Sequence, residues 1–322
     1  MEIRPTYRIL MKDYLDAVYQ GKNNWWRYLL SIAVILFFWL VIGSIPVVLF
    51  SAYLMVDGNS ESGFTETGFS GVDPLIAFFV TMSGFLMFFL AIFISVRFIH
   101  ARPFRSLVTP GRKINWKRLS FGFTFWFVIA CLISFFEAIL YPNRYSTSFD
   151  PIPFLIFFFF AILLIPMQAA CEELFFRGYL MQSLGLRIRG LIVLPLISGL
   201  IFGSLHLWNP EMTETNGSWL LAASYFLIGW FAALITLVDG GLELALGLHV
   251  ANNLYTALVA NSTVSALPSE SIFTINVIDP FYGFISLCIG LLVFYLLAFQ
   301  IFPKEQIVQG MSPSLQEEEL PG

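Results

Sequence analysis

The chain has 322 residues, of which 58% are hydrophobic, 17% aromatic and only 12% charged, with a formal net charge of -4. This composition excludes an average soluble domain and is typical of a polytopic membrane protein. We therefore expect a single membrane domain over residues 1–322.

Eight apolar runs are long enough to cross roughly 30 Å of hydrocarbon as α-helix. Clusters of Pro, Gly, Ser, Asn and Asp separate several of them, as turns require. The sequence therefore predicts an all-α bundle of about eight transmembrane helices. The predicted spans are residues 28–55, 75–99, 118–140, 151–186, 190–208, 218–239, 242–260 and 281–302.

Basic residues fall almost entirely on one side of this predicted bundle. If both termini are on the same side, sixteen of the seventeen Lys and Arg residues lie with them, and only Arg144 lies opposite. The positive-inside rule then predicts two cytoplasmic termini, in an integral multi-pass protein of a bacterial cell membrane. The basic stretch GRKINWKR at 111–118 fits anionic lipid better than nucleic acid, so membrane lipid is the expected partner there.

Two adjacent glutamates follow a long apolar run in CEELFFRGYL, residues 171–180. A charged residue in a membrane helix costs roughly 2.5–3.5 kcal/mol on insertion scales, so such residues usually face a cavity and serve a function. Glu173 and Arg177 are four residues apart, so they share one helix face and can form an ion pair. Glu172 then lies about 100° round the helix and is left to face elsewhere. The charged turn from Asp239 to Glu243 is expected to be a solvated loop.

Two of the three histidines lie in apolar helices with a companion four residues away: Phe202 and His206 in FGSLH, and His249 and Asn253 in HVANN. Glu172 lies roughly 15 residues before the turn between the fourth and fifth spans and His206 roughly 16 after it, so the two are level on antiparallel helices. His249 can reach the same layer. We predict one polar site on the cytoplasmic side of the membrane mid-plane.

This set of side chains indicates hydrolysis. A carboxylate with histidines activates water, directly as a general base or through a bound zinc ion that lowers the pKa of its water towards 7. Glu172, His206 and His249 match a catalytic zinc set of two histidines and one glutamate with an open position. The amide of Asn253 is able to stabilise an oxyanion. Peptide-bond hydrolysis, with or without zinc, is the predicted chemistry.

The three motifs resemble those of a known family. EELFFR at 172–177 matches an EExxxR motif, FGSLH at 202–206 an FxxxH motif, and HVANN at 249–253 an HxxxN motif. In this order, on three helices, they resemble the CAAX-protease and bacteriocin-processing family of intramembrane metalloproteases. The resemblance covers residues 120–260, which we expect to form the catalytic core.

The resemblance implies a role for each site residue. Glu172 would activate the water with His206, Glu173 would support it and pair with Arg177, and His249 with Asn253 would stabilise the oxyanion. In this family the same side chains have been described both as zinc ligands and as a metal-free glutamate site, and the sequence leaves both open. The expected substrate is a membrane-associated protein or peptide, with or without a lipid group, that approaches from the cytoplasmic leaflet.

Two other classes of function stay open. One is a non-catalytic immunity or binding protein of the same fold. The other is a transporter that relays protons or cations through Glu172 and the histidines. Pro166 and Pro195 are the clear helix-breaking candidates within the spans, and neither accompanies a Gly-rich unwound segment of the kind that transporters use. The intact set of motifs favours the enzyme.

Overall fold

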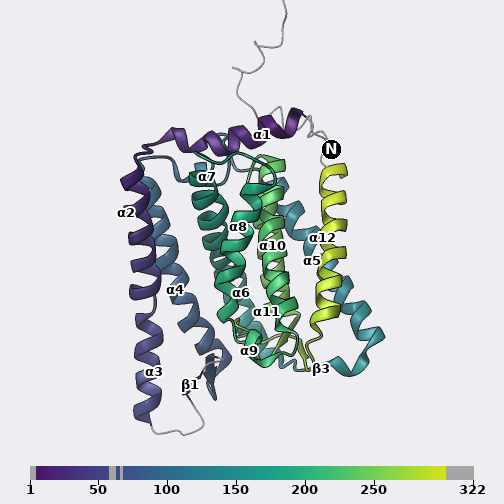
Figure 1. Cartoon of the computed structure of the whole chain (residues 1–322). Coiled ribbons are helices and arrows are strands. Elements are labelled where there is room, and N and C mark those ends of the chain that lie inside the picture. The colour runs from purple at the N-terminus through teal and green to yellow at the C-terminus, as the bar shows by residue number, and fades with distance from the viewer. Residues whose placement is uncertain (1–4, 58–62, 66–67, 302–322) are drawn as a thin grey trace, which may run out of the picture.

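The fold is seen in a computed structural model, which describes residues 5–57, 63–65 and 68–301 (Figure 1). It confirms a mostly helical membrane-type protein. The longest helical stretches are α2 (Trp25–Leu36), η2 (Phe37–Ile42) and α3 (Ile45–Asp57), then α4 (Pro74–Ile94) with η3 (Ser95–Ile99), α5 (Trp116–Leu140), α6 (Pro151–Glu173) with η6 (Leu174–Leu180) and α7 (Met181–Leu184), α10 (Ser218–Asp239) and α12 (Pro280–Ile301).

Each of the eight predicted spans corresponds to helix, but they differ in length. Within the described part of the chain, six helices are long and apolar enough to cross a membrane. The other two predicted spans are shorter: α8 (Val193–Leu205), which continues into η7 (His206–Trp208), and α11 (Glu243–Leu258). The eight-span prediction is thus confirmed approximately, with six long helices and two short ones.

The helix starts follow from local sequence. Asp73 precedes Pro74, and its carboxylate accepts hydrogen bonds from the backbone N–H groups of the next turn of α4. Asp150 caps α6 in the same way, again directly before a proline. Asn115 accepts from the N–H of Arg118 at the start of α5. A short polar acceptor followed by proline is a strong helix-start signal, which explains why these boundaries fall where the turn residues predict.

The two ends of the bundle differ in structure. At one end α1 (Pro5–Asp16) lies across the spans, followed by η1 (Ala17–Gln20), and η4 (Phe104–Leu107) belongs to the loop after η3. At the other end lie η5 (Pro142–Arg144), α9 (Glu211–Glu214), the antiparallel pair β1 (Gly63–Thr65) and β2 (Gly68–Ser70), and a sheet in which β5 (Phe273–Ile275) pairs with both β3 (Tyr145–Thr147) and β4 (Ala260–Ser262).

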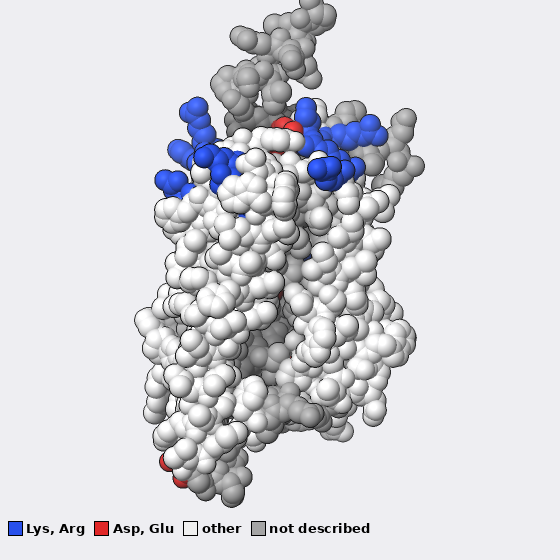
Figure 2. Space-filling model, turned by 60° about the vertical axis from the view of Figure 1, so that its left-hand side comes forward, with Lys and Arg blue, Asp and Glu red and all other residues white. Residues whose placement is uncertain are grey.

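The two ends of the bundle also differ in charge. In Figure 2 the Lys and Arg side chains gather at the end that carries α1, and the long middle of the molecule is uncharged on this face. Large apolar side chains such as Leu49 and Ile152 are well exposed along the spans. An uncharged apolar belt of this kind suits contact with lipid hydrocarbon.

The turn between α10 and α11 corrects one expectation. Asp239 and Glu243 are buried, at 4% and 0% exposure, and do not form a solvated loop. The guanidinium of Arg118 pairs with the Asp239 carboxylate and also donates to its backbone oxygen. Glu243 accepts a hydrogen bond of 3.1 Å from the backbone N–H of Asn115. The turn packs against the start of α5, a contact between distant segments that the local charge pattern does not reveal.

The helices α5 and α11 pack through glycine. A Cβ atom added at Gly247 would lie 2.1 Å from the carbonyl oxygen of Leu119, and one added at Gly122 would lie 2.4 Å from that of Leu244. Small residues let membrane helices approach this closely. Because α11 carries His249, the contact fixes the depth and rotation of that side chain.

We therefore expect Gly247→Ala to destabilise the protein. The added methyl group has no space, and overpacking of this kind costs about 1–3 kcal/mol. The measurement is the thermal unfolding midpoint of the purified protein in detergent. Gly283→Ala in α12 is the matched control, because no heavy atom lies within 4 Å of its added Cβ. Equal midpoints for the two variants would contradict the close packing of α5 against α11.

Candidate functional site

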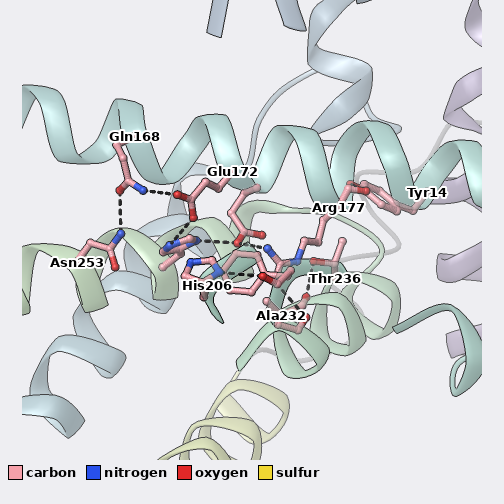
Figure 3. Close-up of polar contacts among 12 residues, drawn as sticks. Tyr14, Gln168, Glu172, Arg177, His206, Ala232, Thr236 and Asn253 are labelled. Carbon is pink, nitrogen blue, oxygen red and sulfur yellow. Dashed lines mark hydrogen bonds and ion pairs between the residues drawn. The ribbon is translucent and has the colours of Figure 1, made fainter. Parts of the chain in front are cut away.

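The predicted polar residues line one cavity of roughly 270 Å³. Its walls come from α4, α6, η6, α8, η7, Asn209, α9, α10, α11 and the loop at 265–267. Figure 3 shows these side chains running in a row between the helices. The structure brings together all six predicted site residues: Glu172, Glu173, Arg177, His206, His249 and Asn253.

Glu173 and Arg177 form the buried ion pair that their spacing predicts. Arg177 Nη1 donates to Glu173 Oε1 at 2.8 Å, and both side chains are only 1% exposed. Arg177 lies in η6, a widened turn that continues α6. Its Nη2 donates to the backbone oxygen of Gly229 in α10 at 3.0 Å, and its guanidinium lies over the ring of Phe202. The charge is thus held by three separate helices, which offsets part of the cost of burying it.

The same glutamate orients His249. His249 Nδ1 lies 2.8 Å from Glu173 Oε1. A carboxylate of a buried ion pair accepts hydrogen bonds, so Nδ1 carries the hydrogen and Nε2 is directed into the cavity. Nε2 lies 3.5 Å from Glu172 Oε2. This separation is at the upper limit for a hydrogen bond but lets both atoms contact one water molecule.

Glu172 takes a different set of contacts from Glu173. Its Oε1 accepts a 2.5 Å hydrogen bond from Gln168 Nε2, and Gln168 Oε1 accepts one of 2.8 Å from Asn253 Nδ2. Gln168 was not predicted as a site residue. It lies four residues before Glu172, so a polar residue on the same face of a very apolar helix was the available signal. The amide of Asn253 is therefore connected to the carboxylate through Gln168.

The His206 side chain is positioned by a contact with the preceding turn of its own helical segment. Its Nδ1 lies 2.8 Å from the backbone oxygen of Phe202, and because a carbonyl oxygen only accepts, Nδ1 carries the hydrogen and Nε2 keeps a lone pair. The ring of Tyr225 stacks on the imidazole with centroids 4.5 Å apart. The FxxxH spacing thus corresponds to a side-chain to backbone contact within α8 and η7, with the aromatic ring of Phe202 packed 4.3 Å from the imidazole.

A second polar group, which the sequence did not reveal, lies beside His206. Glu211 Oε1 accepts hydrogen bonds from the Tyr225 hydroxyl and from Asn209 Nδ2, and Glu211 Oε2 accepts one of 3.2 Å from the backbone N–H of Ala266. All four residues line the cavity. Asn209 directly follows η7, Glu211 begins α9, Tyr225 lies in α10 and Ala266 in a loop far along the chain, so only the tertiary fold joins them.

The cavity extends towards the end of the bundle opposite α1. Asn209, Glu211 and the segment 265–267 belong to that end. The sequence predicts a site on the cytoplasmic side of the membrane mid-plane and a substrate that approaches from the cytoplasmic leaflet. The lining residues instead connect the polar site with the other end.

The cavity contains side chains of the kinds that bind zinc, but these side chains do not surround one common position. Two imidazoles whose Nδ1 contacts leave Nε2 available and one carboxylate are suitable ligands, and contacts of this kind at Nδ1 are those that metal-binding histidines commonly make. Glu172 and His249 form a close pair. Within the described ranges, however, no three His, Cys, Asp or Glu side chains lie close enough together to hold a metal ion. As placed, Glu172, His206 and His249 do not fit a zinc ion.

We expect Arg177→Gln to unfold the site. Removing the cation leaves the Glu173 charge buried without its partner, which costs about 3–5 kcal/mol. Thermal unfolding in detergent measures the loss. Arg189→Gln is the control, because Arg189 pairs with Asp16 at the partly exposed end of the bundle, where such a pair contributes about 1 kcal/mol or less.

A double variant, Glu173→Gln with Arg177→Met, removes both charges and is expected to recover part of the lost stability. Similar midpoints for Arg177→Gln and Arg189→Gln would show that the buried ion pair is not important for the fold.

Comparison with known proteins agrees with this geometry. Residues 151–255, which contain all three motifs, match the family model described as type II CAAX prenyl endopeptidase Rce1-like. The chain is also 32% identical over 289 residues to a Bacillus subtilis (strain 168) protein named "Uncharacterized protein YyaK", covering 87% of this chain and 93% of that relative. No solved structure matches. The chain therefore belongs to the Rce1-like, CAAX-protease and bacteriocin-processing family of multi-pass membrane peptidases.

Proposed function

We propose that this protein is an intramembrane endopeptidase that hydrolyses a peptide bond in a membrane-associated protein or peptide, lipidated or not. The observation that carries the proposal is the pairing of Glu172 Oε2 with His249 Nε2, 3.5 Å apart, in a cavity that also contains His206. A carboxylate next to an imidazole inside a membrane bundle is costly to keep and is suited to activating water.

Glu172 is the general base in this proposal. It takes a proton from a water molecule beside it, and the water oxygen attacks the carbonyl carbon of the substrate. The proton then passes from Glu172 to the amide nitrogen as the peptide bond breaks. Gln168 keeps the carboxylate oriented through its 2.5 Å hydrogen bond to Oε1, which leaves Oε2 for the water. The Nε2 lone pair of His206 accepts a hydrogen bond from the water and helps to position it.

The developing oxyanion needs hydrogen-bond donors. An asparagine amide carries two hydrogens, and Asn253 gives only one of them to Gln168, so the second is free for the oxyanion. In its charged form His249 donates Nε2–H while Nδ1–H stays bonded to Glu173. Glu173 and Arg177 take no part in proton transfer; they hold the His249 ring at the correct angle, as the acidic partner of a histidine does in other hydrolases.

Zinc, with Glu172, His206 and His249 as ligands, is the alternative means of activating the water that the sequence leaves open. Because these side chains do not fit the ion as placed, we assign no step to it. We therefore give priority to the direct role of Glu172.

We expect Glu172→Gln to abolish peptide cleavage by the purified protein, and His206→Gln to reduce it strongly. General acid–base groups contribute about 10²–10⁴-fold to rate, so both losses should exceed a hundredfold. Cleavage of reporter peptides in detergent is the measurement, with thermal unfolding as a check on folding.

Glu270→Gln is the matched control for this pair, because Glu270 is not among the residues that line the cavity. Cleavage by Glu172→Gln at the wild-type rate would refute the proposed mechanism.

Chelation separates the two mechanisms. We expect the enzyme to keep its activity after treatment with a strong chelator, and to contain less than one zinc per chain by elemental analysis. Loss of activity with loss of stoichiometric zinc, and recovery of both when zinc is added back, would instead establish the zinc mechanism. Manganese or magnesium addition serves as the control, since neither prefers a site with two imidazoles.

A further inference from the structure

The cavity is closed towards the end that carries α1. Tyr14 of α1 is fully buried, and its hydroxyl oxygen lies 2.8 Å from the backbone oxygen of Leu107 and 3.3 Å from that of Arg177. In Figure 3 Tyr14 lies at one end of the row of site residues, beyond Arg177, while Gln168 and Asn253 lie at the opposite end. Leu15 and Leu237 pack beside Tyr14, also fully buried. A tight layer therefore separates Glu172 from this surface.

The cavity is continued at the opposite end by loop residues. We call these the mouth: Asn209, Glu211 and residues 265–267. Ala266 is exposed to solvent and also lines the cavity, so the mouth meets the surface. Polar groups along this route, from Glu211 through Tyr225 to the ring of His206, favour water over lipid in the passage.

Charge fixes which side of the membrane the mouth faces. Among the residues that the structure describes, Lys and Arg lie at the α1 end, apart from Arg144 at the mouth end and the buried Arg177 of the site. Arg144 is neutralised by ion pairs with Glu137 at 2.9 Å and Asp279 at 2.5 Å. The positive-inside rule therefore places the α1 end in the cytoplasm. By the same rule, the mouth lies at the extracytoplasmic surface.

We propose that the cavity opens to the extracytoplasmic side, and that the substrate reaches Glu172 through the mouth as a peptide segment exposed at the outer face of the membrane. This replaces the expected approach from the cytoplasmic leaflet. The route of the substrate rests on the proposed function, whereas the opening itself stands on the cavity, the buried layer at Tyr14 and the charge distribution.

The opening is tested by thiol labelling in intact cells. Cys131 and Cys288 are replaced by alanine, and Cys171 is kept because it is fully buried. Single cysteines are then placed at Ala266 in the mouth and at Thr256, which lines the cavity in α11. The probe is a charged maleimide that does not cross membranes. The Arg187→Cys variant reports the α1 end, and the Ile285→Cys variant reports a lipid-facing position of α12.

We expect the cysteines at 266 and 256 to react from outside at least about tenfold faster than those at 187 and 285. The probe does not cross the membrane to reach the cysteine at 187, and the cysteine at 285 lies in lipid, where the reactive thiolate does not form. Permeabilising the cells should make the cysteine at 187 reactive. Reaction at 256 only after permeabilisation, or no reaction there at all, would overturn the proposal. Reaction of the cysteine at 187 in intact cells would do the same, since the whole orientation would then be inverted.

Peptide cleavage gives a separate measurement. Labelled Ala266→Cys protein, purified in detergent, should cleave reporter peptides at least about tenfold more slowly than the same protein unlabelled, because a bulky maleimide blocks the route to the carboxylate. Outside labelling without any peptide cleavage by the unlabelled protein would remove the proposed function and leave the opening in place. Equal cleavage by labelled and unlabelled protein would overturn entry of the substrate through the mouth.

Discussion

The arrangement of the site depends on one buried interaction, the ion pair between Glu173 and Arg177. An ion pair in a low-dielectric interior is costly unless further hydrogen bonds complete it. Here those bonds come from different helices: His249 of α11 contacts the glutamate, and Gly229 of α10 accepts from the arginine. The backbone oxygen of Arg177 also lies 3.3 Å from the hydroxyl oxygen of Tyr14 in α1. The contacts of Glu173 and Arg177 therefore connect α6 and η6 with α10, α11 and α1.

The ion pair also separates the roles of two neighbouring glutamates. Glu173 Oε1 contacts both Arg177 and His249, so its charge is already compensated. Glu172 lies on another face of α6, is 12% exposed, and is contacted by the neutral amide of Gln168 and, at 3.5 Å, by His249. Glu172 lines the cavity and has no guanidinium partner within residues 5–57, 63–65 and 68–301. Adjacent residues of the same type thus differ because a helix turns about 100° per residue.

Local residue spacing predicted contacts within one helix, but it did not predict contacts between segments that are far apart in the sequence. The long apolar runs identified the eight spans, and the four-residue spacing identified the pair of Glu173 with Arg177, because both follow from helix geometry alone. The contact between Glu211 and the loop at Ala266, and the burial of Asp239 against Arg118, involve segments far apart in sequence. Neither follows from a period or a motif.

Helix length explains why a cavity exists at this depth. The two helices that lead to the histidines, α8 and α11, have 13 and 16 residues and span about 20 and 24 Å, less than the roughly 30 Å of hydrocarbon. Since α8 ends at Leu205, the bundle beyond it is completed by η7, α9 and the 265–267 loop instead of by helix. Irregular backbone at membrane depth is tolerated where it is buried or lines a cavity. The short α8 thus leaves His206 at a helix end, next to the space that a longer helix would have filled.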